Sequence, residues 1–508
     1  MSWLLPVLLG VPLAGAVLLG SLPGLDDRAT AALAVAASGG ALGLAGVAAL
    51  GFHPDRGSPS YALDLAWVPT LGVRFAVGVD GLSLPLVVLT ALLVLLCCLH
   101  VVRHPPEGAT PRLLLALVLL LEVGMLGTFL ALDLVLFFVF FEVVLVPMFF
   151  LVAGWGGERR RHASVKFLLY TLLGSALMLV GFLVIGAARA GDRPFDMVAL
   201  GAAHGVGLSR TTQDLAITAL VLGFAVKAPI WPLHTWLPDA HTEAPTVGSV
   251  LLAGVLLKLG TYGLVRIAVG FLPLGARDAA PLLAVLGTVA VVYAALCCLA
   301  QTVSARGDLK RLIAYSSVGH MGFVVLGVAT LSPTGLDAAL IGNVAHGVVT
   351  GLLFFLAGAV KERFGTTSLV SVGGGLLGKA PILGGLLVFA CVASLGLPGL
   401  AGFWGEVLAL VGAADPGAGL SHGFYRTLLV LAAVGTVLTA GYFLKLLATT
   451  AFGPVAEHWR GAAMLDLSVA ELAAWSPLVV LTVAIGVYPR LVLGVTHPAV
   501  VALLGVTP

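Results

Sequence analysis

Residues 247–265 read VGSVLLAGVLLKLGTYGLV, an apolar run with one lysine, Lys258, near its centre. A helix that crosses a membrane needs about 20 predominantly apolar residues, so this stretch has the composition of a membrane span. In a span over 246–270, Lys258 lies about 18 Å from either helix end, because each residue adds about 1.5 Å along the axis. A lysine side chain cannot reach the membrane surface from that depth. We therefore expect a charge held inside a bundle of membrane helices.

The rest of the chain has the composition of a membrane protein. Of its 508 residues, 60% are hydrophobic and only 10% are charged, whereas soluble domains carry roughly 25% charged residues. The net charge of +2, without a basic tract, gives no indication of nucleic-acid binding. The five cysteines lie in apolar runs without CxxC or His/Cys ligand spacing, which predicts buried free thiols.

The apolar runs predict one all-α polytopic membrane domain, 1–508, of about 14 transmembrane helices. The N-terminus lacks the basic start of a signal peptide, so we interpret it as the first span. The polar stretches between spans are too short for a soluble domain. The expected spans are 2–22, 29–51, 80–102, 112–131, 134–153, 164–188, 213–237, 246–270, 280–303, 312–331, 335–360, 381–411, 424–450 and 472–494.

Lysine and arginine residues predict the orientation of the chain, because positively charged loops favour the cytoplasmic side of a membrane. The loops after odd-numbered spans are richer in these residues than the loops after even-numbered spans. We therefore expect both termini outside the cytoplasm. The basic residues of the odd-numbered loops are Arg28, Arg103, Arg112, Arg159, Arg160, Arg161, Arg306, Lys310, Arg311, Lys361, Arg363, Lys379 and Arg460.

Two of the expected spans contain helix-breaking residues. Pro229, Pro232 and Pro238 interrupt the seventh span, and Pro398 interrupts the twelfth among glycines. An interior proline removes a helix hydrogen bond, and irregular backbone at membrane depth persists only where protein or water surrounds it. Breaks five spans apart predict two inverted five-helix repeats, 112–270 and 280–450. The alternative is that both breaks are packing kinks.

Six ionisable residues inside the expected spans form the candidate site. A charge at the bilayer centre costs at least about 2.5 kcal/mol, so such residues face the bundle interior and partner one another. Burial and an opposite charge act on a pKa in opposing directions, so moving one partner releases or captures a proton. Histidine titrates near neutral pH without help. The row predicted to translocate protons is Glu142, Lys227, Lys258, His320, His346 and Glu406.

These residues also have structural interpretations. Glu142 and Lys227 could form a static strut, and His320 and His346 could be satisfied core histidines. Lys258 is the hardest to explain in this way, because its charge lies deepest in an apolar run.

Further path candidates are Glu122, His234 and His241. Glu122 lies in the fourth span, and the two histidines lie with Glu243 in the broken-helix segment, where they could form an exit route or ordinary polar loop residues. Asp133 falls at a helix boundary, where it could simply cap the helix. His234 and His241 have poor spacing for a metal site, and the chain has no CxxCH haem motif and no GxxxxGK[ST] phosphate loop.

Four segments resemble the antiporter-like membrane subunits of respiratory complex I, NADH:quinone oxidoreductase. They look most like the chain M (NuoM) type, which corresponds to mitochondrial subunit 4, and the resemblance covers nearly the whole chain. The segments are KAPIWPLHTWLPDAHTEAPTVGSVLLAGVLLKLGTYGLVR (227–266), LALDLVLFFVFFEVVLVPMFFLVAGWG (130–156), RGDLKRLIAYSSVGHMGFVVLG (306–327) and NVAHGVVTGLLFFLAG (343–358).

The resemblance implies fourteen helices with inverted repeats, and it implies roles for the row. Glu142 and Lys227 match the family's ion pair. Lys258 matches its central proton carrier, Glu406 matches its terminal acid, and the two histidines continue the axis. The implied partners are neighbouring antiporter-like subunits, the rest of complex I and membrane lipid. The chain itself would carry no redox centre, with FMN, iron–sulfur clusters and quinone in other subunits.

Three other functions share some of these features. The chain could belong to a multisubunit cation/proton antiporter or to an energy-converting membrane hydrogenase, or it could be a scaffold whose buried charges only specify helix packing. Few lysines relative to arginines, with abundant alanine, glycine and leucine, are typical of a GC-rich bacterial genome, which predicts the inner (plasma) membrane of a bacterium.

Overall fold

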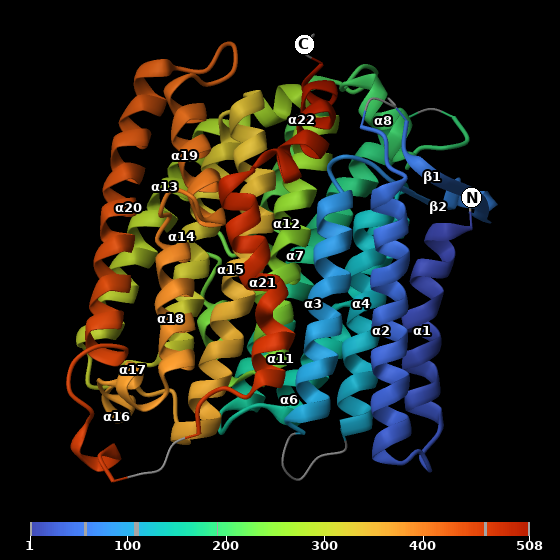
Figure 1. The fold of residues 1–508 in the computed structure, drawn as a ribbon. Helices are drawn as coiled ribbons and strands as arrows, with labels where there is room; N and C mark the ends of the chain where they lie inside the picture. The colour runs from blue at the N-terminus through green and yellow to red at the C-terminus, as the bar shows by residue number, and fades with distance from the viewer. Residues whose placement is uncertain (1–2, 55–57, 106–110, 190, 462–464, 506–508) are drawn as a thin grey trace.

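The computed structural model describes residues 3–54, 58–105, 111–189, 191–461 and 465–505. These residues form a bundle of long helices that run along one direction, with α1 and α2 at one side and α20 at the other (Figure 1). Twelve helices of the described chain are long and apolar enough to cross a membrane. They are α1 (Leu4–Ser21), α2 (Asp27–Leu50), α3 (Leu84–Arg103), α4 (Pro111–Leu130), α5 and α6 together (Leu134–Trp155), α7 (Arg160–Ala188), the segment Thr246–Val269, α13 (Pro273–Val303), α14 (Leu309–Ala329), α15 (Pro333–Phe364), α20 (His422–Thr450) and α21 (Val469–Val487).

The seventh and twelfth expected spans are broken, as their prolines predict. α9 (Arg210–Lys227) stops before the proline-rich segment, and α10 (Trp236–Glu243) begins after it. α18 (Pro381–Ser394) and α19 (Ala401–Ala414) are likewise separated by the segment around Pro398. The total of about 14 spans and the inverted repeats, 112–270 and 280–450, stay predictions.

Two further irregularities flank the candidate site. α5 (Leu134–Val143) ends one residue after Glu142 and gives way to α6 (Leu145–Trp155). The segment that carries Lys258 consists of α11 (Thr246–Leu251), a π-helical turn (Leu252–Leu256), α12 (Leu257–Gly263) and a second π-helical turn (Leu264–Val269). π-Helical turns inside α-helices occur frequently at functional sites.

The expected all-α fold is confirmed, since the chain is nearly all helical, but one segment forms strands. β1 (Ser60–Val68) and β2 (Val73–Val79) form an antiparallel hairpin where we expected only a polar connection. The chain turns through Gly72, whose φ of 66° lies in the left-handed region that favours glycine. Both strands are rich in aromatic and β-branched residues, which fit a pleated surface.

The C-terminal part also differs from expectation. α21 ends at Val487, and Pro489 caps a separate helix, α22 (Arg490–Leu504), where we expected the last span to continue to residue 494. Proline cannot continue the preceding helix, because it lacks an N–H and clashes with the turn before it. The remaining short helices are α8 (Met197–Ala203), α16 (Leu369–Val372) and α17 (Leu376–Lys379).

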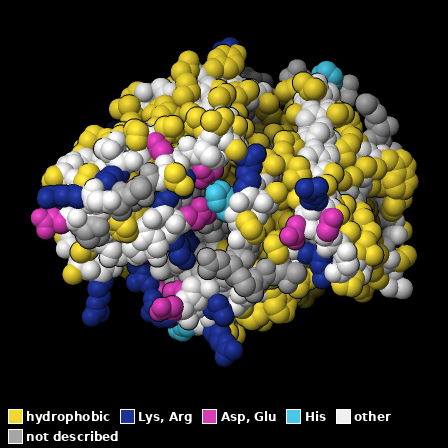
Figure 2. Space-filling view, turned by 60° about the horizontal axis from the view of Figure 1, so that its bottom comes forward, with side chains coloured by type: hydrophobic (Ala, Val, Ile, Leu, Met, Phe, Trp, Pro, Cys, Tyr) yellow, Lys and Arg dark blue, Asp and Glu magenta, His cyan; other side chains and the backbone are white. Residues whose placement is uncertain are grey.

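The helices that carry most of the candidate site lie at the centre of the bundle. In an 18-residue apolar stretch of Thr246–Val269 every residue is buried, and 94% of the residues in such a stretch of α15 are buried. In α20 and α21 only 33% of the residues in such a stretch are buried. The outer helices therefore present apolar side chains outwards, and the central helices are surrounded by protein. The chain termini lie toward one end of the bundle (Figure 1), and Lys and Arg side chains gather on the opposite end (Figure 2).

Candidate functional site

Lys258 is fully buried in α12 and contacts a histidine of α15. Its Nζ atom lies 2.6 Å from Nδ1 of His346, and it also donates to the carbonyl of Ala253 in the preceding π-helical turn. Beside this contact, Oγ1 of Thr261 donates to Oδ1 of Asn343 over 2.9 Å. The same two helices are thus joined twice, and a proton needs to cross only one short nitrogen–nitrogen distance between Lys258 and His346.

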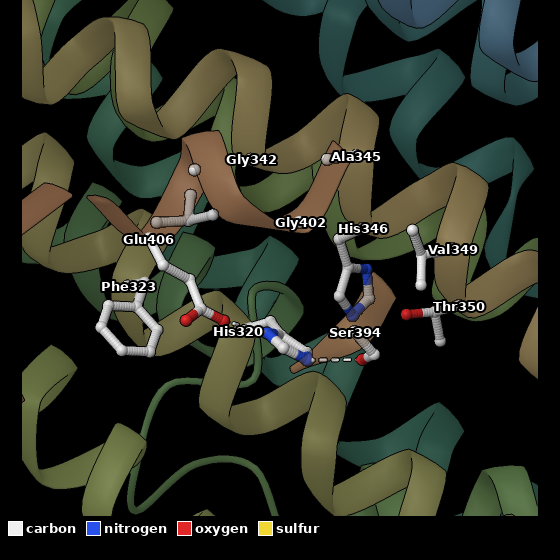
Figure 3. Close-up of a pocket in the computed structure, with 12 residues that line it drawn as sticks. His320, Phe323, Gly342, Ala345, His346, Val349, Thr350, Ser394, Gly402 and Glu406 are labelled. Carbon is white, nitrogen blue, oxygen red and sulfur yellow. Dashed lines mark hydrogen bonds and ion pairs between the residues drawn. The ribbon is translucent and has the colours of Figure 1, made fainter. Parts of the chain in front are cut away.

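His320, on α14, bridges the two halves of the broken twelfth span. Its Nδ1 lies 3.1 Å from Oε1 of Glu406 on α19, and its Nε2 lies 3.0 Å from Oγ of Ser394 at the end of α18 (Figure 3). The break between α18 and α19 therefore places a carboxylate and a hydroxyl on opposite nitrogens of one imidazole. These contacts fix the ring between an acid and a group that both donates and accepts.

A small cavity joins the two histidines. It has a volume of about 30 Å³ and is lined by His320, His346, Thr350, Ser394 and Glu406, among others (Figure 3). The two imidazole centroids are 5.6 Å apart. Nε2 of His346, Oγ1 of Thr350 and Oε2 of Glu406 are buried and lack a hydrogen-bond partner in the described part of the chain. A buried water needs about 10–15 Å³ and two to four polar partners, so this cavity has both the room and the partners for one.

Two close glycine contacts bring the helices of the site together. A Cβ atom on Gly405 would lie 2.7 Å from Cα of Gly342, so this glycine lets α19 approach α15 next to Glu406. A Cβ atom on Gly260 would lie 2.7 Å from the backbone nitrogen of Ala228, which follows Lys227 at the end of α9. Both approaches are too close for any larger residue without a shift of backbone.

Lys227 ends α9 and is only 2% exposed. Its Nζ atom lies 4.9 Å from the ring centroid of Phe141 and 5.9 Å from that of Phe167, distances at which a cation is attracted to an aromatic face. Glu142 lies within electrostatic range of this lysine. Within the described ranges, however, no ion pair of 4.0 Å or less joins the two side chains. The pair that the resemblance implies is therefore open in this structure.

Comparison with known proteins now identifies the family. Residues 131–449 match the family described as NADH:quinone oxidoreductase/Mrp antiporter, TM. The chain belongs to this family. It is 38% identical over 464 residues to NADH-quinone oxidoreductase subunit M of Rhodobacter capsulatus, covering 89% of this chain and 86% of the relative. It is 40% identical over 451 residues to NAD(P)H-quinone oxidoreductase chain 4 1 of Nostoc sp. (strain PCC 7120 / SAG 25.82 / UTEX 2576), covering 88% of this chain and 81% of the relative.

Solved structures agree with this family assignment. A chain of respiratory complex I from Thermus thermophilus with bound NADH has a TM-score of 0.86 and 33% identity, and the match covers 99% of both chains. A chain of the Mrp complex from Dietzia sp. DQ12-45-1b has a TM-score of 0.84 over 99% of this chain and 97% of that one. Its 23% identity shows a shared fold only.

The three additional path candidates have different surroundings in the structure. Glu122 is fully buried in α4, and neither of its oxygens has a hydrogen-bond partner among the described residues. His234 lies in the break after α9, with its ring 5.1 Å from that of Tyr293. His241 is fully buried in α10 and stacks on Phe354 of α15 at 4.4 Å. Lys258 and Lys310 lie within electrostatic range of His241, which makes this histidine the best placed of the three.

Other buried polar residues were not expected from the sequence. Lys310, which we assigned to a loop, lies in α14, is 3% exposed and donates to the carbonyl of Ala244. Its spacing of three from the buried Ile313 places both on one helix face and was the available signal. Arg266 is 8% exposed and forms an ion pair with Asp80. An arginine inside an apolar run was the signal for this pair.

Asp133 caps a helix, as its boundary position predicts. Its Oδ1 accepts hydrogen bonds from the backbone N–H groups of Val135 and Leu136 at 2.9 and 3.1 Å. Burial raises the pKa of Asp133 above its ordinary value, and these backbone hydrogen bonds oppose that effect. All five cysteines are free, and four of them are buried, in agreement with the prediction.

Proposed function

We propose that this chain is the M-type membrane-arm subunit of a proton-translocating NADH:quinone oxidoreductase, respiratory complex I. The observation that carries the proposal is the pairing of Lys258 with His346 and of His320 with Glu406 on either side of one cavity. Four titratable groups in contact at the centre of a bundle form a proton path rather than a set of isolated charges. The names of the relatives support the same assignment.

The proposed mechanism begins at Lys227 and Glu142. A conformational or charge change arriving from a neighbouring subunit closes or opens this pair. Closing it neutralises the positive charge of Lys227, which makes it easier for Lys258 to hold a proton; opening it has the reverse effect. The released proton passes to His346, crosses the cavity to His320 and reaches Glu406. The chain itself moves protons only, and the coupling is electrostatic and mechanical.

The same assignment implies where the redox cofactors lie, which neighbours the chain has and how it is oriented in the membrane. FMN, the iron–sulfur clusters and quinone would be held by other subunits, and neighbouring antiporter-like subunits and lipid would cover the outer helices. The end of the bundle rich in lysine and arginine would face the cytoplasm of a bacterium, with both termini on the other side of its inner membrane.

Deletion of the chain, with complementation, tests this function. Inverted membrane vesicles would be compared for NADH-driven acidification, quinone-linked NADH oxidation, and sodium/proton exchange without NADH. We expect acidification and quinone-linked oxidation to be lost on deletion and restored by the wild-type chain. Sodium/proton exchange that follows the chain in the absence of NADH would instead favour a cation/proton antiporter.

A further inference from the structure

The short helix α10 carries an ion-pair cluster that the proton row does not use. Nζ of Lys166 on α7 lies 2.8 Å from Oδ2 of Asp239, and Nη2 of Arg311 on α14 lies 3.3 Å from Oδ1 of the same carboxylate. Within the described ranges, neither cation has a second ion-pair partner. One carboxylate therefore joins α10 to one helix from each predicted repeat, 112–270 and 280–450.

Asp239 and His241 point in nearly opposite directions from α10. Successive residues of an α-helix are rotated by about 100°, so residues two positions apart lie about 200° apart around the axis. Asp239 is 25% exposed, whereas His241 is fully buried and stacks on Phe354 of α15 with ring centroids 4.4 Å apart. The ion pairs thus hold α10 by the face that lies away from the histidine.

The His241 ring has no hydrogen bond to orient it. Both of its nitrogens are buried and lack a hydrogen-bond partner in the described part of the chain. Its position therefore depends on where the backbone of α10 lies. Oγ of Ser249 donates to the carbonyl of His241 at 3.2 Å, and Lys310 donates to the carbonyl of Ala244, directly after α10. Asp239 adds the contacts that fix α10 against α7 and the first turn of α14.

We propose that Asp239 is a positioning residue for proton delivery to Lys258 and that it acts through His241. His241 lies within electrostatic range of Lys258. In this step a proton leaves the imidazolium of His241 and is taken up by the neutral amine of Lys258. Asp239 fixes the height and rotation of α10, and so the distance that this proton crosses. The inference rests on the proposed function, because it needs Lys258 to receive protons.

The shared carboxylate predicts an unequal response to the loss of its partners. A single ion pair between partly exposed side chains holds weakly, but Asp239 keeps one cation when the other is removed. We therefore expect Lys166→Met and Arg311→Met each to retain an intermediate rate of proton pumping. The double variant should fall to the rate of Asp239→Asn, which loses the charge that attracts both cations.

NADH-driven acidification by inverted membrane vesicles, per assembled complex, tests the inference. We expect Asp239→Asn to lower the rate by about tenfold or more, because a displacement of about 1 Å lowers a positioned reaction by up to about 10²-fold. Asp239→Glu keeps the charge and should restore most of the rate. Asp278→Asn, which removes the carboxylate of the exposed ion pair with Arg210, is the matched control and should pump at the wild-type rate.

A second background tests whether Asp239 acts through the histidine. In a His241→Gln chain, which should itself pump more slowly than wild type, Asp239→Asn should cause no further loss. An additional loss in that background would overturn the inference, as would a wild-type rate in Asp239→Asn or in His241→Gln.

Backbone hydrogen exchange of residues 236–243 in the purified complex separates this inference from the proposed function. We expect faster exchange in Asp239→Asn than in wild type, because α10 loses contacts with both neighbouring helices. Asp239→Glu and Asp278→Asn should exchange at the wild-type rate. Unchanged exchange in Asp239→Asn would overturn the inference whatever the chain transports. Acidification that does not depend on the chain would instead refute the proposed function, and the exchange result would still decide whether Asp239 positions α10.

Discussion

Nζ of Lys258 lies 2.6 Å from Nδ1 of His346, although 88 positions separate the two residues along the chain. Both residues belong to helices that are surrounded by protein. A lysine in such a place needs a polar partner, since an isolated buried charge costs several kcal/mol. The contact supplies that partner and also connects Lys258 to the cavity shared with His320 and Glu406.

The contact with Lys258 predicts a strong effect of His346→Gln. Glutamine fills a similar space and forms hydrogen bonds, but it cannot carry a proton at neutral pH. We expect NADH-driven acidification to fall by about tenfold or more, because a positioned acid–base group accelerates proton transfer by about 10²–10⁴. The exposed His162→Gln serves as the control. Acidification at the wild-type rate in His346→Gln would mean that the path avoids this histidine.

Two substitutions of Glu406 test whether proton transfer needs its titratable carboxyl or only a hydrogen-bonding group. Its Oε1 lies 3.1 Å from Nδ1 of His320. Glu406→Gln keeps a hydrogen-bonding group at this position but removes the titratable carboxyl, whereas Glu406→Asp keeps the carboxyl on a shorter side chain. We expect acidification to be low in the glutamine variant and intermediate in the aspartate variant, at equal levels of assembled complex. The reverse order would contradict a role in proton transfer.

The close approach of α19 to α15 predicts a packing defect in Gly405→Ala. The new Cβ atom would lie 2.7 Å from Cα of Gly342, so backbone must move. Such overpacking costs about 1–3 kcal/mol, and it would also displace the neighbouring Glu406 from His320. We expect a lower thermal transition of the complex and weaker acidification. Gly385→Ala is the matched control on α18, because its Cβ atom would have no neighbour within 4 Å; identical behaviour of the two variants would refute the packing account.

The open pair of Glu142 and Lys227 predicts energetic coupling without direct contact in the present conformation. A double-mutant cycle would combine Glu142→Gln with Lys227→Gln and measure acidification rates. We expect a coupling energy of about 0.5–3 kcal/mol, because the two charges affect the same equilibrium. Additive effects, within about 0.3–0.5 kcal/mol, would show that the residues act independently.

The sequence predicted which residues are buried charges better than it predicted their contacts. A lysine at the centre of an apolar run has few physical explanations, so Lys258 stood out. Its partner His346 depends on how α12 packs against α15, and one sequence carries no information on that register. Ser394 was not expected as a partner of His320, because a serine in an apolar helix ordinarily bonds to its own backbone.

The sequence also did not predict local backbone geometry in segments where hydropathy was the only signal. The prolines predicted both broken spans, but the π-helical turns on either side of α12 have no proline and no polar residue pattern to mark them. Lys310 was assigned to a loop because the expected span began at residue 312, yet α14 begins at Leu309 and turns Lys310 inward. The hairpin of β1 and β2 was not predicted, because we interpreted its segment as a polar connection between spans.

Proton pumping by Lys258→Ala in inverted membrane vesicles tests the central claim most directly. NADH oxidation with an artificial acceptor would verify that the complex has assembled, and a pH-sensitive dye would report acidification. If the buried row is the proton path, acceptor activity persists while acidification and quinone-linked turnover collapse. If acidification continues at the wild-type ratio to NADH oxidation, the buried charges are structural and the proposed path is wrong.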